Sequence, residues 1–559
     1  MIVFERRFFE MTEERKGVTY ATSFREQLTV RGMIIGALGA VVLTMSSMYV
    51  ALKLGALPWP IIFVALVSMF FLKLMGKTNI NEINVTHTAM SAGAMTAGGL
   101  AFTLPGIFML HPDAELDLLK IMTVVLGGVL LGLIFTALIR KYFVVTKELP
   151  YPMGQAAAET ILVGDAGGKK SITLFTSMGL AAIFTVVRDW FVAFPAAWLS
   201  PKMMGYGSLA GVWWSPMLIG VGYVIGPVFV GVWFLGAIIG DFGILVGGTE
   251  IGWWDGATAA AIKASLGIGL MVGTGLGIIV KGILPKAKEI FGPMFSKEAL
   301  GQGFISLRWA PIAMVLLAAL FTTVTGMGII ASIITILGVW LATSMSAQMV
   351  GQSGINPMEV FGIIVLLAAK AASSIGETEA FFVAAIVAIA CGLAGDVMND
   401  FKAGYILKTD PKAQWIAEAI GGLVGAFVAV GVFYVILTAY GPTAFGNPEM
   451  FVAPQAAAVA AMVGGIPHMT SFLIGLALGI ILYVLNFPVM TLGLGVYLPF
   501  YLSLTAFIGG AARFIVQKFI PKFETSGNGL IIASGLLGGE AVVGVVIALI
   551  QAIPAILAI

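Results

Sequence analysis

Long apolar segments separated by short polar turns recur along almost the whole chain. Each is roughly 20 residues long, the length that an α-helix needs to cross a bilayer. The segments lack the period-2 alternation of membrane β-strands, so the pattern predicts spanning helices. The first series lies near 32–52, 57–75, 84–110, 118–139, 150–164, 171–196, 216–247 and 257–284. The second lies near 309–325, 327–349, 357–375, 380–403, 414–438, 454–466, 469–487, 489–517 and 526–557.

The two series look like copies of one another, because four pairs of short motifs occur in the same order in both. The pairs are Gly76–Asn81 with Gly351–Asn356, Tyr151–Ala158 with Val452–Ala458, Pro216–Pro227 with Pro488–Pro499, and Lys263–Gly267 with Ile532–Leu536. Duplicated halves are typical of secondary transporters, which hold their substrate between the halves near the membrane midplane. A channel would instead favour one symmetric ring of subunits, so the duplication favours alternating access.

Two segments, 150–164 and 454–466, are short for a full span. Each opens with a proline, followed by Gln155 or Gln455 and by small residues. This is the pattern of a half-helix whose N-terminal N–H groups point into a cavity. The alternative is an ordinary tilted helix with proline in its first turn.

The prediction is therefore an all-α, polytopic integral membrane protein with short or broken half-helices in two duplicated halves of about 8 helices each. Lys and Arg gather in the N-terminal segment and in a central linker, which places both in the cytosol. The first thirty residues have no signal-peptide core and are expected to stay on the chain. The predicted divisions are a cytosolic segment 1–30, a first transmembrane repeat 31–290, a cytosolic linker 291–307 and a second repeat 308–559.

Composition narrows the class of protein further. Hydrophobic residues make up 59% of the 559 and charged residues only 10%, against about 25% in soluble domains. A net charge of +2 without a basic patch gives no indication of nucleic acid as a partner. One cysteine and three scattered histidines suggest neither a disulfide nor a dedicated metal cage. No phosphate loop, HExxH or GxSxG motif is present, so we expect no enzyme and no cofactor.

Ionisable side chains inside apolar segments are the candidates for function, because burying them in lipid is expensive. Asp396 and Asp400 stand four apart after a long apolar run, so a continuing helix puts both carboxylates on one face. They need water, a cation or a partner there, unless the helix end simply reaches the lipid headgroups. The candidate proton or cation carriers are Glu159, Glu359, Asp396, Asp400, Glu540 and His87.

A second polar group surrounds the pair Asn356-Pro357. Proline breaks a helix and frees carbonyl groups that can bind a cation or a peptide N–H. Glu359 and Lys370 lie three turns apart on nearly the same face, where they could grip the two ends of an elongated zwitterion. The candidate substrate contacts are Gln155, Gln352, Asn356, Lys370, Gln455 and Tyr405.

Several motifs match one known family: Arg25–Gly32, Tyr49–Gly55, Asn84–Gly93, Thr103–Gly106, Glu148–Pro152, Ala394–Tyr405 and Gly495–Pro499. They resemble the oligopeptide transporter family, in its prokaryotic branch related to the yellow-stripe metal-chelate transporters. The resemblance covers nearly the whole chain after residue 25. It implies about sixteen transmembrane helices, from a doubling of eight, and proton-coupled uptake of short peptides, peptide-like compounds or metal complexes of small carboxylate chelators.

We therefore expect a proton-coupled symporter of the plasma membrane that imports such solutes by alternating access. The alternatives are a channel or passive pore, and a cation-coupled permease for another small zwitterionic solute. The expected partners are the solute, protons and the lipid bilayer, with a homodimer as one option.

Overall fold

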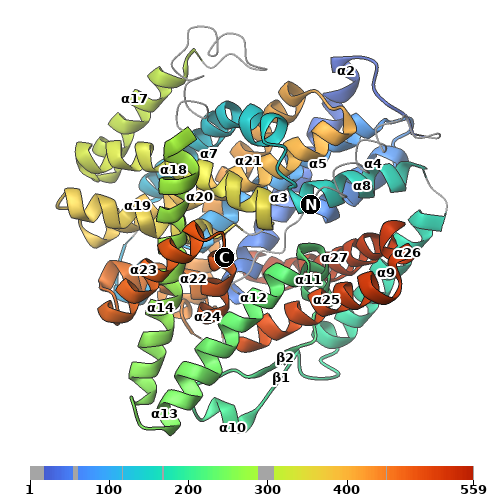
Figure 1. Ribbon diagram of the computed structural model, residues 1–559. Coiled ribbons are helices and arrows are strands. Elements are labelled where there is room, and N and C mark those ends of the chain that lie inside the picture. The colour runs from blue at the N-terminus through green and yellow to red at the C-terminus, as the bar shows by residue number, and fades with distance from the viewer. Residues whose placement is uncertain are drawn as a thin grey trace.

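The computed structural model is a bundle of helices and describes residues 18–54, 61–115, 117–166, 169–286, 308–354, 356–447 and 450–557 (Figure 1). The predicted linker 291–307 and residues 1–17 of the N-terminal segment lie outside the described residues. Ten described helices are long and apolar enough to cross a membrane, or eleven if one bent pair counts as a span. The prediction of a polytopic helical membrane protein is confirmed. The count of about sixteen is not reached by this criterion, because several apolar helices have fewer than 18 residues.

The helices before the linker are α2 Phe24–Gln27, α3 Val30–Leu54, α4 Ile61–Leu74, α5 Ile80–Ala101, α6 Gly106–Leu110, α7 Leu118–Arg140, α8 Pro152–Ala166, α9 Lys169–Thr185, α10 Pro201–Met204, α11 Pro216–Ile225, α12 Pro227–Ala237, α13 Gly248–Glu250 and α14 Gly256–Gly277. Four π-helical turns prolong them, η2 Lys141–Thr146, η3 Val186–Trp190, η4 Ile238–Gly247 and η5 Ile278–Ile283, and a 3-10 turn, η6, covers Leu284–Lys286.

The helices after the linker are α17 Ala310–Leu320, α18 Gly328–Ser353, α19 Met358–Ala372, α20 Glu377–Leu407, α21 Pro411–Tyr440, α22 Pro454–Gly464, α23 Met469–Val484, α24 Val489–Tyr497, α25 Phe500–Phe519, α26 Pro521–Thr525 and α27 Asn528–Leu557. A π-helical turn, η7 Phe321–Thr325, prolongs α17, and a 3-10 turn, η8 Pro442–Ala444, follows α21.

Helix α20 forms the centre of the bundle, with α5, α7, α18, α19 and α21 packed around it (Figure 1). Its apolar window is wholly buried within the bundle, whereas that of α21, of similar mean hydropathy, is 44% buried. Small residues allow this close packing: a Cβ added at Gly99 of α5 would lie 2.5 Å from the Cα of Ile389 in α20. The same holds for Gly421 of α21, where a Cβ would lie 1.9 Å from the carbonyl oxygen of Ala89 in α5.

We expect Gly421→Val to push α21 away from α5 and to lower the free energy of unfolding by about 1–3 kcal/mol or more, as overpacking does. Thermal unfolding of the purified protein in detergent measures this. The matched control is Gly431→Ala on the same helix, where an added Cβ meets nothing within 4 Å. Equal melting temperatures for Gly421→Val and Gly431→Ala would contradict the close approach of the two backbones.

The order and packing of the helices run in parallel in the two halves. Helices α3, α4, α5, α7, α8, α9, α11, α12 and α14 follow the same order as α18, α19, α20, α21, α22, α23, α24, α25 and α27. Contacts are reciprocal as well: α7 packs on α20 as α21 packs on α5, and α11 packs on α25 as α24 packs on α12.

Three of the four motif pairs fall at equivalent places in this order. Gln155 and Gln455 stand in the first turns of α8 and α22. The prolines that begin α11 and α12 match those that precede α24 and α25. The segments at Lys263 and Ile532 lie in α14 and α27. The pairing of Asn81 with Asn356 is wrong, because Asn81 lies in the first turn of α5 whereas Asn356 precedes α19.

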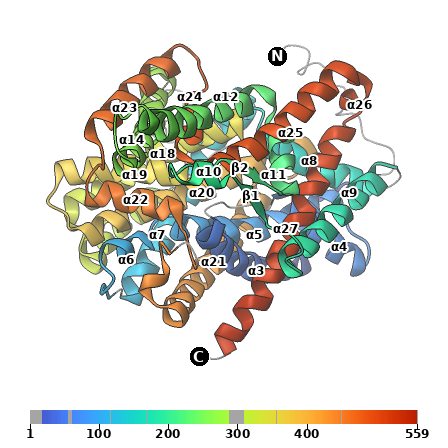
Figure 2. The same ribbon diagram turned by 90° about the horizontal axis from the view of Figure 1, so that it is seen from below.

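A short β-hairpin interrupts the helices between η3 and α11, within a region that the sequence predicted only as helices and a loop. Strands β1 (Ala197–Leu199) and β2 (Gly211–Trp213) pair antiparallel. Seen from below, the hairpin and α10 lie near the middle of that face (Figure 2). Tyr206 donates a hydrogen bond to Glu250 at 2.7 Å and so ties this segment to the end of α13.

Asp255, in the loop between α13 and α14, caps α14 by accepting from the N–H of Thr258 at 2.7 Å. Its hydrogen bonds to the Thr258 amide and side chain hold the pKa of this carboxyl below its usual value.

Candidate functional site

Three carboxylates meet where α20 packs against α21, in the interior of the bundle. Asp396 and Asp400 lie one turn apart on α20, as their spacing predicted, and Glu418 joins them from α21. One carboxylate oxygen of each residue lies within 4.8 Å of the others. All three residues have 0% exposure, so the cluster lies in the core and not at a helix end near the lipid headgroups. We call Asp396, Asp400 and Glu418 the carboxylate cluster.

His87 of α5 contacts the carboxylate cluster from the other half of the chain. Its Nε2 lies 3.0 Å from Oδ1 of Asp400, and its Nδ1 lies 2.8 Å from the carbonyl oxygen of Asn84. A carbonyl only accepts hydrogen bonds, so Nδ1 carries a proton. In a neutral imidazole Nε2 is then an acceptor that faces a second acceptor. The contact between Nε2 and Oδ1 would therefore be favourable only with a proton between the two atoms.

Asp400 is held in place by two further contacts. Ser91 of α5 donates its hydroxyl to Oδ2 of Asp400 at 3.0 Å. The side-chain amide of Gln414, one turn before Glu418 on α21, donates to the backbone carbonyl of Asp400 at 2.6 Å. Asp400 therefore joins α5, α20 and α21 at one point.

The other two carboxylates have no such support. Within the described residues, no hydrogen-bond donor reaches either oxygen of Asp396 or of Glu418. Two like charges about 4–5 Å apart repel by about 3–4 kcal/mol even at an effective dielectric constant of about 20. Three ionised carboxylates are therefore unfavourable together at this position, and the carboxylate cluster requires protons or a cation.

The structure thus brings together three of the predicted proton or cation carriers, His87, Asp396 and Asp400. It adds Glu418, an acid inside an apolar segment that is not among the proton or cation carriers predicted from the sequence. A signal for it was present, since Gln414 and Glu418 stand four apart on one face of an otherwise apolar helix.

The Asn356-Pro357 break lies between α18 and α19, as predicted. Asn356 donates its amide to the carbonyl oxygen of Cys391 on α20 at 2.8 Å and accepts from Ser346 at 2.9 Å. Its polar groups therefore fasten the break to the central helix. Glu359 lies in the first turn of α19 and is 8% exposed, while the side chain of Gln352 lies outside the described residues.

We expect Asn356→Ala to lower the free energy of unfolding by about 1–3 kcal/mol, because it removes two hydrogen bonds that each contribute about 0.5–1.5 kcal/mol. Thermal unfolding in detergent measures this. The control is Glu377→Gln, which weakens only the exposed pair with His111 and should cost about 1 kcal/mol or less. An unchanged melting temperature for Asn356→Ala would show that these hydrogen bonds contribute little.

The half-helices have partners at their ends. At the start of α8, the N–H of Gly154 donates to the side chain of Asn399 in α20 at 3.0 Å. The N–H of Gly154 therefore has a partner within the protein and does not point into a cavity. Gln155 and Glu159, from the same helix, are partly exposed.

Polar side chains lie at both ends of helix α22 as well. Gln455 lies in its first turn and is 8% exposed. Lys370, expected to bind substrate, donates to the carbonyl oxygen of Val463 at 2.8 Å and thereby caps the C-terminal end of α22. The axis then turns by 111° into α23, which makes α22 and α23 a broken span or a re-entrant loop.

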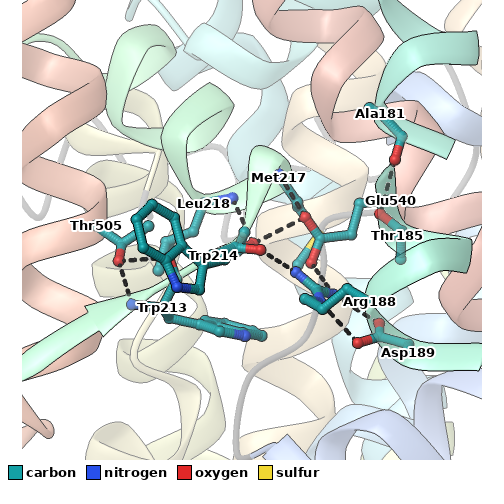
Figure 3. A network of polar contacts seen from close by, with 11 residues as sticks. Ala181, Thr185, Arg188, Asp189, Trp213, Trp214, Met217, Leu218, Thr505 and Glu540 are labelled. Carbon is teal, nitrogen blue, oxygen red and sulfur yellow. Dashed lines mark hydrogen bonds and ion pairs between the residues drawn. The ribbon is translucent and has the colours of Figure 1, made fainter. Parts of the chain in front are cut away.

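Glu540 of α27 lies in a separate network, some distance along the chain from the carboxylate cluster (Figure 3). Arg188 pairs with one oxygen of Glu540 at 2.9 Å. The other oxygen accepts from the Ser215 hydroxyl at 2.9 Å and from the Met217 amide at 2.7 Å. Arg188 also donates to Asp189 and to the carbonyl of Trp214. Both oxygens of Glu540 thus have partners, unlike those of Asp396 and Glu418.

Tyr405, the last candidate contact, stands near the end of α20 and is 42% exposed. The ammonium group of Lys402 lies 5.8 Å from the centre of its ring. Tyr405 lies one turn beyond Phe401 on α20 and is not part of the carboxylate cluster.

A buried carboxylate cluster at the crossing of helices from both halves, in a polytopic helical bundle, is typical of a membrane transporter. The model of the family described as OPT oligopeptide transporter protein matches residues 27–551. The chain belongs to the oligopeptide transporter family, which confirms the resemblance, and it is a multi-pass membrane protein.

Individual relatives fall into two groups by name. A Haemophilus influenzae protein named as an oligopeptide transporter is 27% identical over 90% of this chain and 92% of its own length. The Oryza sativa subsp. japonica protein named as metal-nicotianamine transporter YSL6 is 22% identical over 79% of this chain and 76% of its own. Its relative YSL9 is 23% identical over 57% of this chain and 52% of its own.

Proposed function

We propose that this protein is a secondary active transporter that imports small oligopeptides, peptide-like compounds or metal-chelate complexes across the plasma membrane, driven by protons. Family membership and the names of its relatives support the class of substrate. The buried contact between Nε2 of His87 and Oδ1 of Asp400, 3.0 Å long, is the single observation that carries the coupling. It joins α5 of the first half to α20 of the second.

The carboxylate cluster is the proposed site of the coupled protons. Its three carboxylates are free of exposure to solvent and cannot all be ionised without a counter-charge. Protonation neutralises them, and loss of protons restores the repulsion between them. Such a change in charge shifts the packing of α5, α20 and α21 only if the protein has two conformations whose carboxylate clusters bind protons with different affinity.

We propose that the halves 31–290 and 308–559 are repeats that move against one another in alternating access. The parallel order of the helices and their reciprocal packing support this division. The short helices α8 and α22 occupy matching places and both stand beside α20, the central helix. Motion of one repeat against the other would then rearrange contacts on both sides of α20.

Substrate contacts stay predictions. We keep Gln155, Glu159, Gln352, Glu359, Gln455 and Tyr405 as candidates for a substrate site separate from the carboxylate cluster. Asn356, Lys370 and Glu540 have partners within the protein, so a role in binding substrate or protons would require them to release those partners. A homodimer also stays a prediction, which the mass of the purified protein in detergent would test.

Uptake into liposomes tests the coupling. We expect an inward proton gradient to stimulate uptake of a peptide or metal-chelate, and a protonophore to abolish the stimulation. The same liposomes with an inward sodium gradient and no proton gradient form the control. Uptake that follows only the sodium gradient would overturn the assignment of protons, and uptake that follows neither gradient would favour a passive pore.

A further inference from the structure

The carboxylate cluster has the geometry of an ion site as well as that of a proton site. Each of its three residues offers one oxygen, and these oxygens all lie within 4.8 Å of one another. Two oxygen ligands on opposite sides of a calcium-sized cation, each bound at about 2.4 Å, are about 4.8 Å apart. Three atoms no more than 4.8 Å from one another lie within about 2.8 Å of a common point, so shifts of a few tenths of an ångström would bring all three carboxylates to bonding distance of one cation.

A second observation is that three other buried carboxylates of this chain are each supported by a charged donor. Glu82 is paired with Arg31 at 2.7 Å, Asp241 with Lys263 at 2.6 Å and Glu540 with Arg188 at 2.9 Å. Each of the three also accepts from a serine or threonine hydroxyl.

Asp396 and Glu418 differ from this pattern although both have 0% exposure. Within the described part of the chain, none of their four oxygens receives a hydrogen bond, and Glu418 reaches from α21 toward the pair on α20. Buried carboxylates without donors are costly, so their arrangement indicates a ligand that this chain does not itself provide.

The charge and donor type of the site indicate the class of ligand. Three carboxylates at one buried point carry up to three negative charges, which a divalent cation compensates better than a monovalent one. The ligand atoms are carboxylate oxygens, which suit hard cations such as Mg²⁺, Ca²⁺ and Mn²⁺ and not soft ones.

We propose that Asp396, Asp400 and Glu418 bind one hard divalent cation directly and so fasten α20 to α21. This proposal rests on the proposed function, because it concerns the same three carboxylates. It deepens that function by naming a cation as a second occupant of the site. It differs from the expectation of no metal site, which considered cysteine and histidine; here carboxylates from two helices form the site. The cation is bound by the protein itself, so binding requires no chelator.

The test uses the full-length protein in detergent, stripped of metal with a chelator and titrated with Mn²⁺ at neutral pH. Electron paramagnetic resonance measures free Mn²⁺, because the sharp six-line signal of the free ion is lost on binding. We expect saturable binding of one Mn²⁺ per chain and a higher melting temperature. Asp396→Asn and Glu418→Gln should each weaken binding at least about tenfold. Glu377→Gln, an exposed acid outside the site, should leave it unchanged.

Absence of saturable binding by the wild-type protein would overturn the proposal, as would equal affinity in wild type and both variants. Should either variant fail to fold, Glu418→Asp keeps the charge and withdraws the oxygens by one methylene, and it too should bind at least about tenfold more weakly. Proton-driven uptake into liposomes without divalent cations is measured separately. If it occurs while Mn²⁺ does not bind, the cation site fails and the proposed function stands.

Discussion

Asp400→Asn should abolish proton-driven uptake while the protein stays folded. The amide has the size of the carboxylate, can still accept from Ser91 and can donate to Nε2 of His87, so the packing around it is preserved. It cannot bind and release a proton. Net uptake requires this release in each cycle, so the expected rate is that of protein-free liposomes.

A second measurement separates loss of coupling from loss of substrate binding. Exchange of external for internal substrate requires the loaded protein to change conformation but requires no release of protons. We expect Asp400→Asn to keep exchange and to lose gradient-driven uptake. Glu377→Gln serves as the control and should keep both. Loss of both activities in Asp400→Asn would assign Asp400 to substrate binding or folding, and normal net uptake would remove it from the coupling mechanism.

Arg188→Met should produce the largest loss of stability among the substitutions considered. In the native protein the side chains of Arg188 and Glu540 are only 3% and 6% exposed. The substitution therefore leaves Glu540 buried without its charged partner. Removing one partner of a buried pair costs about 3–5 kcal/mol. Unfolding in detergent measures the change.

The double variant Arg188→Met with Glu540→Gln tests the cause. The neutral amide needs no counter-charge, so the double variant should be more stable than Arg188→Met alone. The exposed pair of His111 and Glu377 is the matched comparison and should contribute about 1 kcal/mol or less. Equal stability of the single and double variants would show that the loss comes from Arg188 contacts other than Glu540, such as that with Trp214.

The sequence predicted the helical membrane class because the length and apolarity of a segment are local properties. It predicted the shared face of Asp396 and Asp400 for the same reason, since four residues make about one turn. It could not predict the contact of His87 or Ser91 with Asp400, because Ser91 and Asp400 are 309 positions apart and only the packing of α5 on α20 joins them.

Contacts between distant segments also lie beyond the sequence. The spacing of Lys370 and Glu359 predicts two contacts to an elongated zwitterion, but it gives no indication that the carbonyl end of α22 accepts from Lys370 inside the protein. The sequence does not place Glu418 beside Asp396 and Asp400, because a single acid in a long apolar segment gives no indication of its neighbours on another helix. The hairpin of β1 and β2 was missed because each strand has only 3 residues and lies between strongly apolar segments.

The complete burial of the carboxylate cluster has a kinetic consequence. A group with no exposed surface exchanges its proton or ion with solvent only when the surrounding helices separate. The tight backbone contact between Gly421 and Ala89 lies next to Glu418 in the sequence, on the pair of helices that would have to part. Collective motions of this kind take microseconds to milliseconds in proteins generally. The frequency of that opening is therefore an upper limit on the turnover of the transporter, however steep the gradient that drives it.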